Sequence, residues 1–396
     1  DVFKNEPMDF EPGEKFLYNN SGYILLGHII EVASGQSYED FIEKNIFSKI
    51  GMENSYYGSM KEIIENRAYG YQLDPTSEGY VNAEYLSLTI PYAAGSIMST
   101  VDDLLKWQNA LSANKFVKRE TLNKAINGSK LNDGTEIPYG YGWGKGEING
   151  SKAITHSGGI FGYTSNGIYL PNEDIYVVGL SNCNCKNISQ TTMMLAAEAI
   201  GKPFPSLDDT VELSESQLKK WVGAYEFEDE NAVRFIQYEN GKLTSLREGS
   251  ETFEIHPLSE NRFVFDDVTI EYSFKMENGK KMVEMKNNGT VRIGKFVDKA
   301  PPSARKTIDL SVAELKTYEG NYQLNPMMTI KVFVEDETIY AQLTGQPKIE
   351  IFPESKTLFF LKAVPAELEF HANGDNDWKG LTLRQGGQQM EAAKVE

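Results

Sequence analysis

Tyr18 and Asn20 place an aromatic hydroxyl and an amide two residues apart, directly ahead of an apolar stretch. Polar groups that a rigid element holds in place are suited to catalysis. The alternative is that Tyr18 packs as an ordinary aromatic residue and that Asn20 only caps the helix that follows. Taken alone, this stretch favours the second interpretation.

His156 is the most informative of the four histidines, because it opens the segment HSGG at 156–159. The glycines leave the backbone uncovered, so such a strand could accept a ligand edge-on and offer N–H groups to an oxyanion. A lone histidine beside a turn is equally often an ordinary surface residue, and the segment alone does not decide. His28 lies within the apolar stretch and is expected to be a packing residue.

A serine followed three residues later by a lysine is another pattern with chemical potential, because the two side chains would share a helix face. The chain contains three matches: Ser112 with Lys115, Ser216 with Lys219, and Ser303 with Lys306. The first runs into a polar segment, and the third lies in a proline-rich connector. The second falls in a repeated segment whose other copy has Ala313 at the serine position. We therefore assign none of them as a nucleophile.

Helices are predicted to position Tyr18 and Asn20. Apolar residues after Asn20 recur at spacings of three, four and seven, which predicts a helix with one buried face over 20–30. A second helix is expected over 37–46, capped by Ser37 with Asp40 three residues on. Ser99 and Thr100 are good caps for a third helix that extends through residue 111, which we interpret as structural.

Strands are predicted to position His156. The segment YGYGWG at 139–144 alternates aromatic residues with glycine, which on a strand would place every aromatic ring on one face. Further strands are expected over 165–170 and 175–182, followed by a helix over 189–200. Helices, then antiparallel strands, then a helix indicate an α+β domain. The long stretch 53–88 has little periodicity and is expected to be a surface excursion that shapes a cleft.

Cys183 and Cys185 are the only cysteines, and one residue separates them. A bridge across that spacing would be strained, so we expect ordinary residues at the end of a strand. Two cysteines without paired histidines make a poor metal site. We expect no metal and no other cofactor.

Length and charge limit the remaining possibilities. The 396 residues suffice for two or three domains, and a net charge of −18 argues against nucleic acid or an anionic membrane as a partner. No apolar run reaches the length of a transmembrane helix. The chain starts abruptly at Asp1 without a visible leader, which leaves open that a leader was removed.

The C-terminal half repeats itself with an offset of 97 residues (310 minus 213). The segments 213–219 and 310–316 both contain a capping box, and each is followed by an aromatic residue, a glycine and a tyrosine. Short alternating strands follow in both copies, with Asn-Gly hairpin signals at 240–241, 278–279, 288–289 and 373–374. We predict two related all-β modules, small barrels or sandwiches, over 210–300 and 303–396, after a first domain over 1–205.

Four segments together resemble the serine β-lactamase and penicillin-binding-protein superfamily: PGEKFLYNNSGYILLGHIIE, AAGSIMSTVDDLLKW, YGYGW and HSGGIFGY. Their order and spacing over residues 1–200 are most similar to the class C β-lactamase and D-alanyl-D-alanine carboxypeptidase branch, the peptidase S12-like group. That branch also holds esterases and D-amino-acid peptidases. The two C-terminal modules resemble the lipocalin-like domains that some members carry.

The resemblance assigns roles to the residues that match the family motifs. Tyr18 would be the general base or proton relay, and Asn20 would hold the substrate amide. His156 would give positive charge or a hydrogen bond to a substrate carboxylate. Ser157 would contact that carboxylate, Gly158 matches the glycine of the family's strand motif, and the Gly159 N–H would form half of the oxyanion hole. A histidine where most β-lactamases have lysine favours peptidase or esterase work.

The family's Ser-x-x-Lys nucleophile precedes the tyrosine motif, but the 17 residues before Tyr18 contain no serine. We therefore expect a serine hydrolase whose nucleophile lies outside this chain, in a longer product or a separate N-terminal fragment. The chain alone would be inactive and would expose apolar surface. Its substrate would be a small peptide, a β-lactam or an ester, and its compartment periplasmic or extracellular. The alternative is a noncatalytic protein that binds cell-wall peptide or another protein through a degenerate cleft.

Overall fold

The computed structural model describes residues 7–58, 62–74, 79–185, 188–227, 232–247, 252–287, 290–302, 305–325, 328–344, 346, 348–362, 364, 366–372, 377–385 and 388–395. The chain forms two compact units, one spanning residues 1–204 and the other most of residues 205–396. The division at 205, 210 and 303 that the sequence suggests stays a prediction. Within the described residues, no helix is long and apolar enough to cross a membrane.

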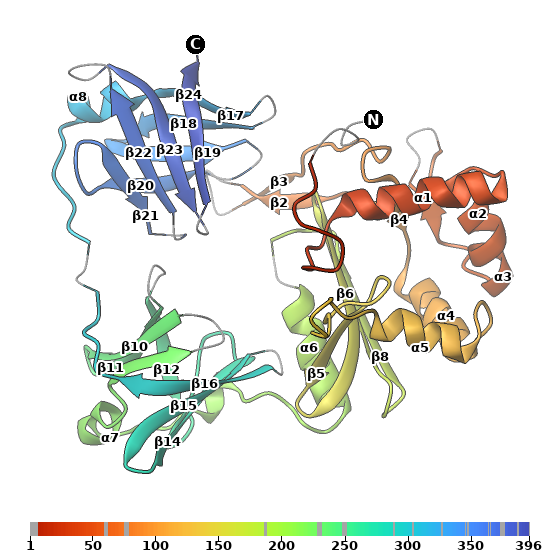
Figure 1. Cartoon of the computed structure of the whole chain (residues 1–396), viewed down its shortest axis with the longest axis horizontal. Helices are drawn as coiled ribbons and strands as arrows, with labels where there is room; N and C mark the ends of the chain where they lie inside the picture. Colours follow the sequence, from red (N-terminus) through yellow and green to blue (C-terminus); the bar gives the residue numbers. More distant parts are fainter. Residues whose placement is uncertain are drawn as a thin grey trace. The chain divides into compact units, whose positions relative to one another are not determined.

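A four-stranded antiparallel sheet forms the centre of the first unit. Its strands follow one another in space as in sequence: β5 (Gly144–Ile148), β6 (Ser151–Ile160), β7 (Tyr163–Leu170) and β8 (Ile175–Ser181). Helix α6 (Ile188–Ala199) covers one face, where small and branched apolar side chains form a core. These elements confirm the strands and the helix expected from the sequence, and with them the α+β class (Figure 1).

Helices precede the sheet in the first unit (Figure 1). They are α1 (Asn20–Ser34), α2 (Tyr38–Ile42), the π-helix η1 (Glu43–Phe47), α3 (Ser48–Ile50), α4 (Val101–Ser112) and α5 (Arg119–Asn127). Ser37 and Thr100 cap α2 and α4 as predicted, accepting hydrogen bonds from the backbone N–H groups of Asp40 and Asp103. Two short ladders, β1 (Tyr56–Tyr57) with β4 (Ile97–Met98) and β2 (Tyr71–Leu73) with β3 (Tyr80–Asn82), and the 3-10 helix η2 (Tyr92–Ala94) lie between α3 and α4.

The prediction of one buried face on α1 is only partly correct. Ile30 packs against a core cluster, but a second group of apolar residues forms an exposed stripe. Gly27 is the one buried residue of α1, because it lies against Tyr92 and Ala93. Leu25, Leu26, Ile29 and Val32 are exposed, from 49% for Leu25 to 74% for Val32. His28 is also exposed, with Nδ1 3.7 Å from Glu31, and is not a packing residue. An exposed apolar stripe of this kind is typical of a surface that another segment or protein covers.

The YGYGWG segment is not a strand, contrary to the prediction. Gly142 has φ +92°, a left-handed conformation that breaks an extended chain. The segment turns back on itself, since the Gly140 N–H donates to the Trp143 carbonyl over 2.7 Å and only Gly144 joins the sheet. The Tyr141 N–H donates to the Ala125 carbonyl over 2.7 Å, which fixes this turn against the end of α5.

Cys183 and Cys185 form a disulfide, so their assignment as ordinary unpaired residues is also wrong. The chain turns directly after β8 and brings the two Cα atoms to 5.1 Å, within the range that a disulfide spans. The Asn182 side chain donates to the Tyr69 carbonyl, and the Tyr71 N–H donates to the Asn182 carbonyl. The bridge therefore lies where the sheet meets β2.

Two closed barrels of eight strands each follow, which confirms the predicted pair of all-β modules. After the 3-10 helix η3 (Leu207–Asp209) and α7 (Glu215–Lys219), the first barrel contains β9 (Gly223–Phe227), β10 (Ala232–Glu239), β11 (Lys242–Arg247), β12 (Thr252–Pro257), β13 (Arg262–Val264), β14 (Ile270–Glu277), β15 (Lys280–Asn287) and β16 (Thr290–Val297). After α8 (Val312–Leu315) and η4 (Lys316–Tyr318), the second contains β17 (Gly320–Asn325), β18 (Met328–Glu335), β19 (Thr338–Leu343), β20 (Ile349–Pro353), β21 (Leu358–Leu361), β22 (Ala366–Ala372), β23 (Trp378–Gln385) and β24 (Gln388–Val395).

The 97-residue repeat is visible in matching contacts. Both predicted capping boxes form, at Ser214 and Ser311. The buried hydroxyls of Tyr225 and Tyr322 each donate over 2.7 Å to the carbonyl four residues earlier. Asn-Gly pairs with positive φ turn the chain at 240–241 and 278–279, as predicted, whereas the pairs at 288–289 and 373–374 lie outside the described residues.

Tyr225→Phe tests the stabilising role of this repeated hydrogen bond. The substitution leaves the Trp221 carbonyl buried without its donor, so we expect the free energy of unfolding of the first barrel to fall by about 1–2 kcal/mol. Urea denaturation measures the change. Tyr238→Phe on β10 is the control, and an equal loss in that variant would show that the hydrogen bond is not the cause.

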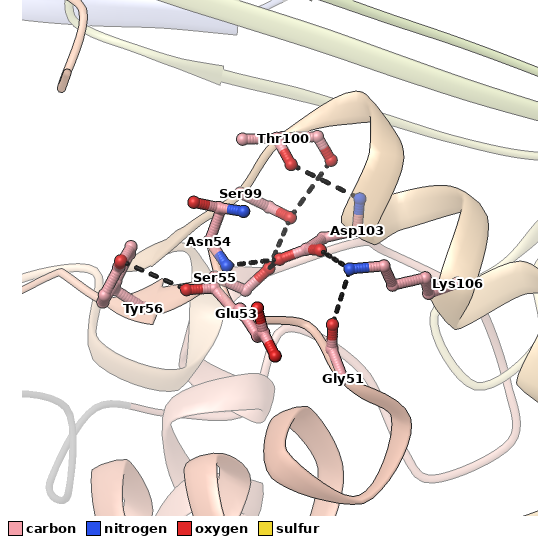
Figure 2. A network of polar contacts seen from close by, with 9 residues as sticks. All are labelled: Gly51, Glu53, Asn54, Ser55, Tyr56, Ser99, Thr100, Asp103 and Lys106. Atoms are coloured by element: carbon pink, nitrogen blue, oxygen red, sulfur yellow. Dashed lines mark hydrogen bonds and ion pairs between the residues drawn. The ribbon is translucent and has the colours of Figure 1, made fainter. Parts of the chain in front are cut away.

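A buried carboxylate joins α4 to the segment after α3 (Figure 2). The Asp103 side chain is fully buried, and its oxygens accept hydrogen bonds of 2.8 Å each from the Asn54 N–H, the Ser55 hydroxyl and Lys106 Nζ. Lys106 also donates to the Gly51 carbonyl over 2.6 Å. Burial disfavours the charged carboxylate, but these donors outweigh burial and lower the pKa of Asp103. The network supports the structural interpretation of α4.

Candidate active site

Tyr18 and Asn20 lie at the start of α1, and neither of them caps the helix. Asn19 is the cap, since its side-chain oxygen accepts a hydrogen bond of 2.8 Å from the Gly22 N–H. Asn20 is therefore not needed for this purpose, and its side chain is exposed on the first turn. Tyr18 is 47% exposed and not a buried packing residue.

His156 lies on β6 beyond the point where β5 ends. β5 pairs with residues 151–155, while β7 pairs with 154–160. Residues 156–160 therefore have a strand on one side, and no described strand pairs with their other side. Some of their N–H and C=O groups point outward at this edge, where an extended ligand could pair with them.

Alternation along β6 separates the predicted substrate-binding side chains. Ser157 pairs with Asn166, whose buried amide donates to Thr192 on α6, so Ser157 belongs to the face toward α6. His156 belongs to the opposite face. Gly158 and Gly159 are exposed and extended, and a side chain on Gly158 would collide with the Ser165 hydroxyl at 2.6 Å.

Tyr18 and His156 come together, although 138 positions separate them (156 minus 18). Their ring centroids are 6.4 Å apart, and Tyr139 lies next to both, 5.6 Å from Tyr18 and 5.8 Å from His156. The Tyr139 hydroxyl is 2.8 Å from His156 Nε2 and 3.0 Å from the Tyr23 hydroxyl. Burial, followed by the contact with Tyr23, raises the pKa of Tyr139 well above its ordinary value, so this phenol keeps its proton.

Sequence reasoning missed Tyr23 and Tyr139. Tyr23 lies within the apolar spacing that predicts a helix over 20–30, and Tyr139 begins the aromatic-glycine alternation that suggests a strand, so neither residue stands out as a site residue. The short distance in sequence between YGYGW and HSGG could have indicated that Tyr139 lies near His156. The turn at Gly142 that brings them together is not evident from the alternation of aromatic residues and glycine.

The rejection of the Ser-x-x-Lys matches agrees with the contacts that the structure describes. Ser112 accepts a hydrogen bond from Gln108 over 3.2 Å at the end of α4. Lys219 forms an ion pair with Glu215 and is therefore held as a cation, which cannot accept a serine proton. Ser303 lies outside the described residues.

Known proteins share sequence with both parts of the chain. Residues 1–196 match the Beta-lactamase family, and residues 304–394 match a domain of unknown function, DUF3471. Penicillin-binding protein 4* of Bacillus subtilis is 31% identical over 296 residues, which cover 70% of this chain and 65% of that protein. The serine β-lactamase-like protein LACTB of Bos taurus is 32% identical over 198 residues, 43% of this chain and 35% of that protein.

A solved structure is also similar. The octameric penicillin-binding protein homologue from Pyrococcus abyssi has a TM-score of 0.45 and 27% identity, covering 72% of this chain and 66% of its own. The chain thus spans 65% of the first relative and about a third of the second. The first unit carries a Beta-lactamase family domain, and the chain belongs to the serine β-lactamase and penicillin-binding-protein superfamily.

Proposed function

We propose that the first unit supplies half of a serine hydrolase site that acts on an amide or ester through an acyl-enzyme. The observation that carries this proposal is the convergence of Tyr18 and His156 at the open edge of β6. Tyr18 would move the proton of the nucleophile and of the attacking water, and Asn20 would hold the substrate amide. The Gly159 N–H would stabilise the oxyanion and His156 would bind the substrate carboxylate, with Gly158 keeping the strand accessible. Ser157 belongs to the other face of β6, so its contact with that carboxylate would be made at the edge of the strand.

The nucleophile would come from a segment that this chain does not contain, either upstream in a longer product or on a separate N-terminal fragment. The exposed apolar stripe of α1 supports this, because it begins at Leu25, seven residues after Tyr18 (25 minus 18), and needs a covering partner. A segment that covered this stripe would bring a Ser-x-x-Lys pair to Tyr18.

The substrate would be a small peptide next to a D-amino acid, a β-lactam or a small ester. A histidine in place of the family's usual lysine favours the peptide and the ester over the β-lactam. Members of the family mostly work outside the cytoplasm, so we propose that this protein is periplasmic or extracellular. The two barrels carry no assigned role in this reaction.

Steady-state hydrolysis by the product of the complete gene tests the proposal. We expect turnover of a p-nitrophenyl ester and of a D-alanyl-D-alanine peptide, with slower turnover of a chromogenic cephalosporin. His156→Gln should lower turnover of the peptide more than of the ester, because only the peptide has a carboxylate for the imidazole to bind. Absence of turnover with all three substrates would contradict the proposal.

The second candidate is a noncatalytic protein that binds cell-wall peptide or another protein at the same edge. The stretch 156–160 favours it, because no described strand pairs with the side opposite β7 and strand addition needs only backbone groups. It predicts saturable binding of peptidoglycan fragments by the 396-residue chain without a covalent adduct. A titration without measurable affinity would remove this candidate.

A further inference from the structure

Three polar groups from separate elements form a continuous line at the site. Tyr23 comes from α1, Tyr139 from the turn before β5 and His156 from β6. The Tyr139 hydroxyl lies between the other two, 3.0 Å from the Tyr23 hydroxyl and 2.8 Å from His156 Nε2. Both distances are those of hydrogen bonds.

The direction of these hydrogen bonds follows from the chemistry of the groups. A phenol has one proton to donate, so Tyr139 donates to either His156 or Tyr23. The phenol oxygen is a weak acceptor, because its lone pair is delocalised into the ring, whereas the unprotonated nitrogen of an imidazole is a strong acceptor. The favoured arrangement therefore runs from Tyr23 to Tyr139 and from Tyr139 to Nε2 of a neutral His156.

This arrangement determines which ring nitrogen of His156 carries the proton. If Nε2 accepts a hydrogen bond, the neutral imidazole must hold its proton on Nδ1. No hydrogen bond to Nδ1 occurs among the described residues, and the side chain is exposed at the edge of β6. Nδ1–H is therefore the donor that the ring offers to a ligand.

We propose that Tyr139 is a positioning residue, which holds His156 in the Nδ1-protonated form so that a neutral Nδ1–H group faces the substrate. The part that concerns substrate rests on the proposed hydrolase function, and the tautomer does not. A neutral donor recognises a carboxylate by a directed hydrogen bond rather than by charge. The site would then select ligands by the position of the carboxylate and would keep that selectivity at high salt.

The surroundings of Tyr139 suit a positioning role. Its ring stacks on Phe16 at 5.7 Å and meets Tyr18 edge-on at 5.6 Å, which limits rotation of the phenol. The backbone that follows Tyr139 is fixed by the turn, because the Gly140 N–H donates to the Trp143 carbonyl and the Tyr141 N–H donates to the Ala125 carbonyl on α5. A phenol held in this way imposes its direction on the imidazole.

Nitrogen-15 NMR of the histidine rings tests the proposal without any substrate. In the 396-residue chain, at a pH where titration shows the imidazole to be neutral, we expect Nδ1 of His156 to resonate as a protonated nitrogen and Nε2 as an unprotonated one. Tyr139→Phe removes the donor, so the tautomer ratio should move toward Nε2–H by roughly fivefold, the equivalent of one hydrogen bond. The signal that disappears in His156→Gln identifies the His156 resonances among those of the four histidines.

Two variants keep this test decisive. Tyr141→Phe removes a hydroxyl two residues away on the same turn and should leave the ratio unchanged. Tyr23→Phe should also preserve the Nδ1–H form, because Tyr139 still donates to Nε2. A wild-type ring protonated on Nε2, or a ratio unaffected by Tyr139→Phe, would overturn the proposal. Because the measurement involves no catalysis, its failure is distinct from a failure to hydrolyse substrates.

Discussion

Tyr18→Phe should lower kcat about 10²–10⁴-fold in the form of the protein that turns over substrate, with little change in KM. The substitution keeps the ring and its contacts with Tyr139 and His156, and it removes only the hydroxyl that would move protons. No described residue forms a hydrogen bond with this hydroxyl, so the fold should not depend on it. Stopped-flow or steady-state rates with an activated ester measure the effect.

Tyr340→Phe in the second barrel is the matched control, because it removes the same group from another module. Its kcat should equal that of the wild type. Thermal unfolding of both variants should also be unchanged. If Tyr18→Phe retained kcat within about threefold, Tyr18 would have no part in proton transfer.

Asp103→Ala should lower the free energy of unfolding of the first unit by about 3–5 kcal/mol. The Asn54 N–H and the Ser55 hydroxyl would lose their shared acceptor in a buried place, and Lys106 would lose its partner. Lys106 is 42% exposed and can be hydrated, so the lower part of this range is the expected result. Urea denaturation measures the loss.

Asp102→Ala is the control, since this exposed carboxylate lies in the same first turn of α4 and would lose only its interaction with the helix dipole, about 0.3–1 kcal/mol. The pKa of Asp103 is lowered by folding, so its stabilising effect is complete above the pKa of about 4 in the unfolded chain. It is lost as pH falls further, through the folded pKa. The difference in the free energy of unfolding between the wild type and Asp103→Ala should therefore become smaller at acidic pH. A difference that stays constant with pH would contradict this account.

The elements that local chemistry specifies were predictable. Alternation and turns located β7, β8 and α6 to within a few residues, and the 97-residue repeat with its capping boxes and Asn-Gly turns indicated two related modules. The helix caps were also predictable from the sequence, since Ser37 and Thr100 cap their helices as expected. In each case the signal comes from residues close together in the sequence.

The failures have a common physical origin in contacts between distant residues. The apolar stripe of α1 predicts burial, but no described segment covers it. The alternation in YGYGWG suggests a strand, yet the segment forms a turn at Gly142. This turn packs against α5 so closely that a side chain on Gly140 would collide with the Ala125 carbonyl. The disulfide depends on how sharply the chain turns after β8.

The sequence predicted the motif residues of the candidate site but not the residues that contact them. Tyr18, Asn20 and His156 carried a pattern, and the structure brings Tyr18 and His156 together. The roles of these residues stay a proposal. Tyr139 and Tyr23 join the site only through the packing of α1 against the turn before β5, which no local pattern encodes.

The intact mass of every polypeptide purified from expression of the complete gene, before and after incubation with an acylating β-lactam, tests the central claim most directly. The account predicts a heavier chain, or a second co-purifying piece, that contains a Ser-x-x-Lys segment and gains the mass of one acyl group on that serine. A single species of 44.5 kDa that gains no mass would contradict it, and Tyr18, Asn20 and His156 would then line a binding site without a nucleophile.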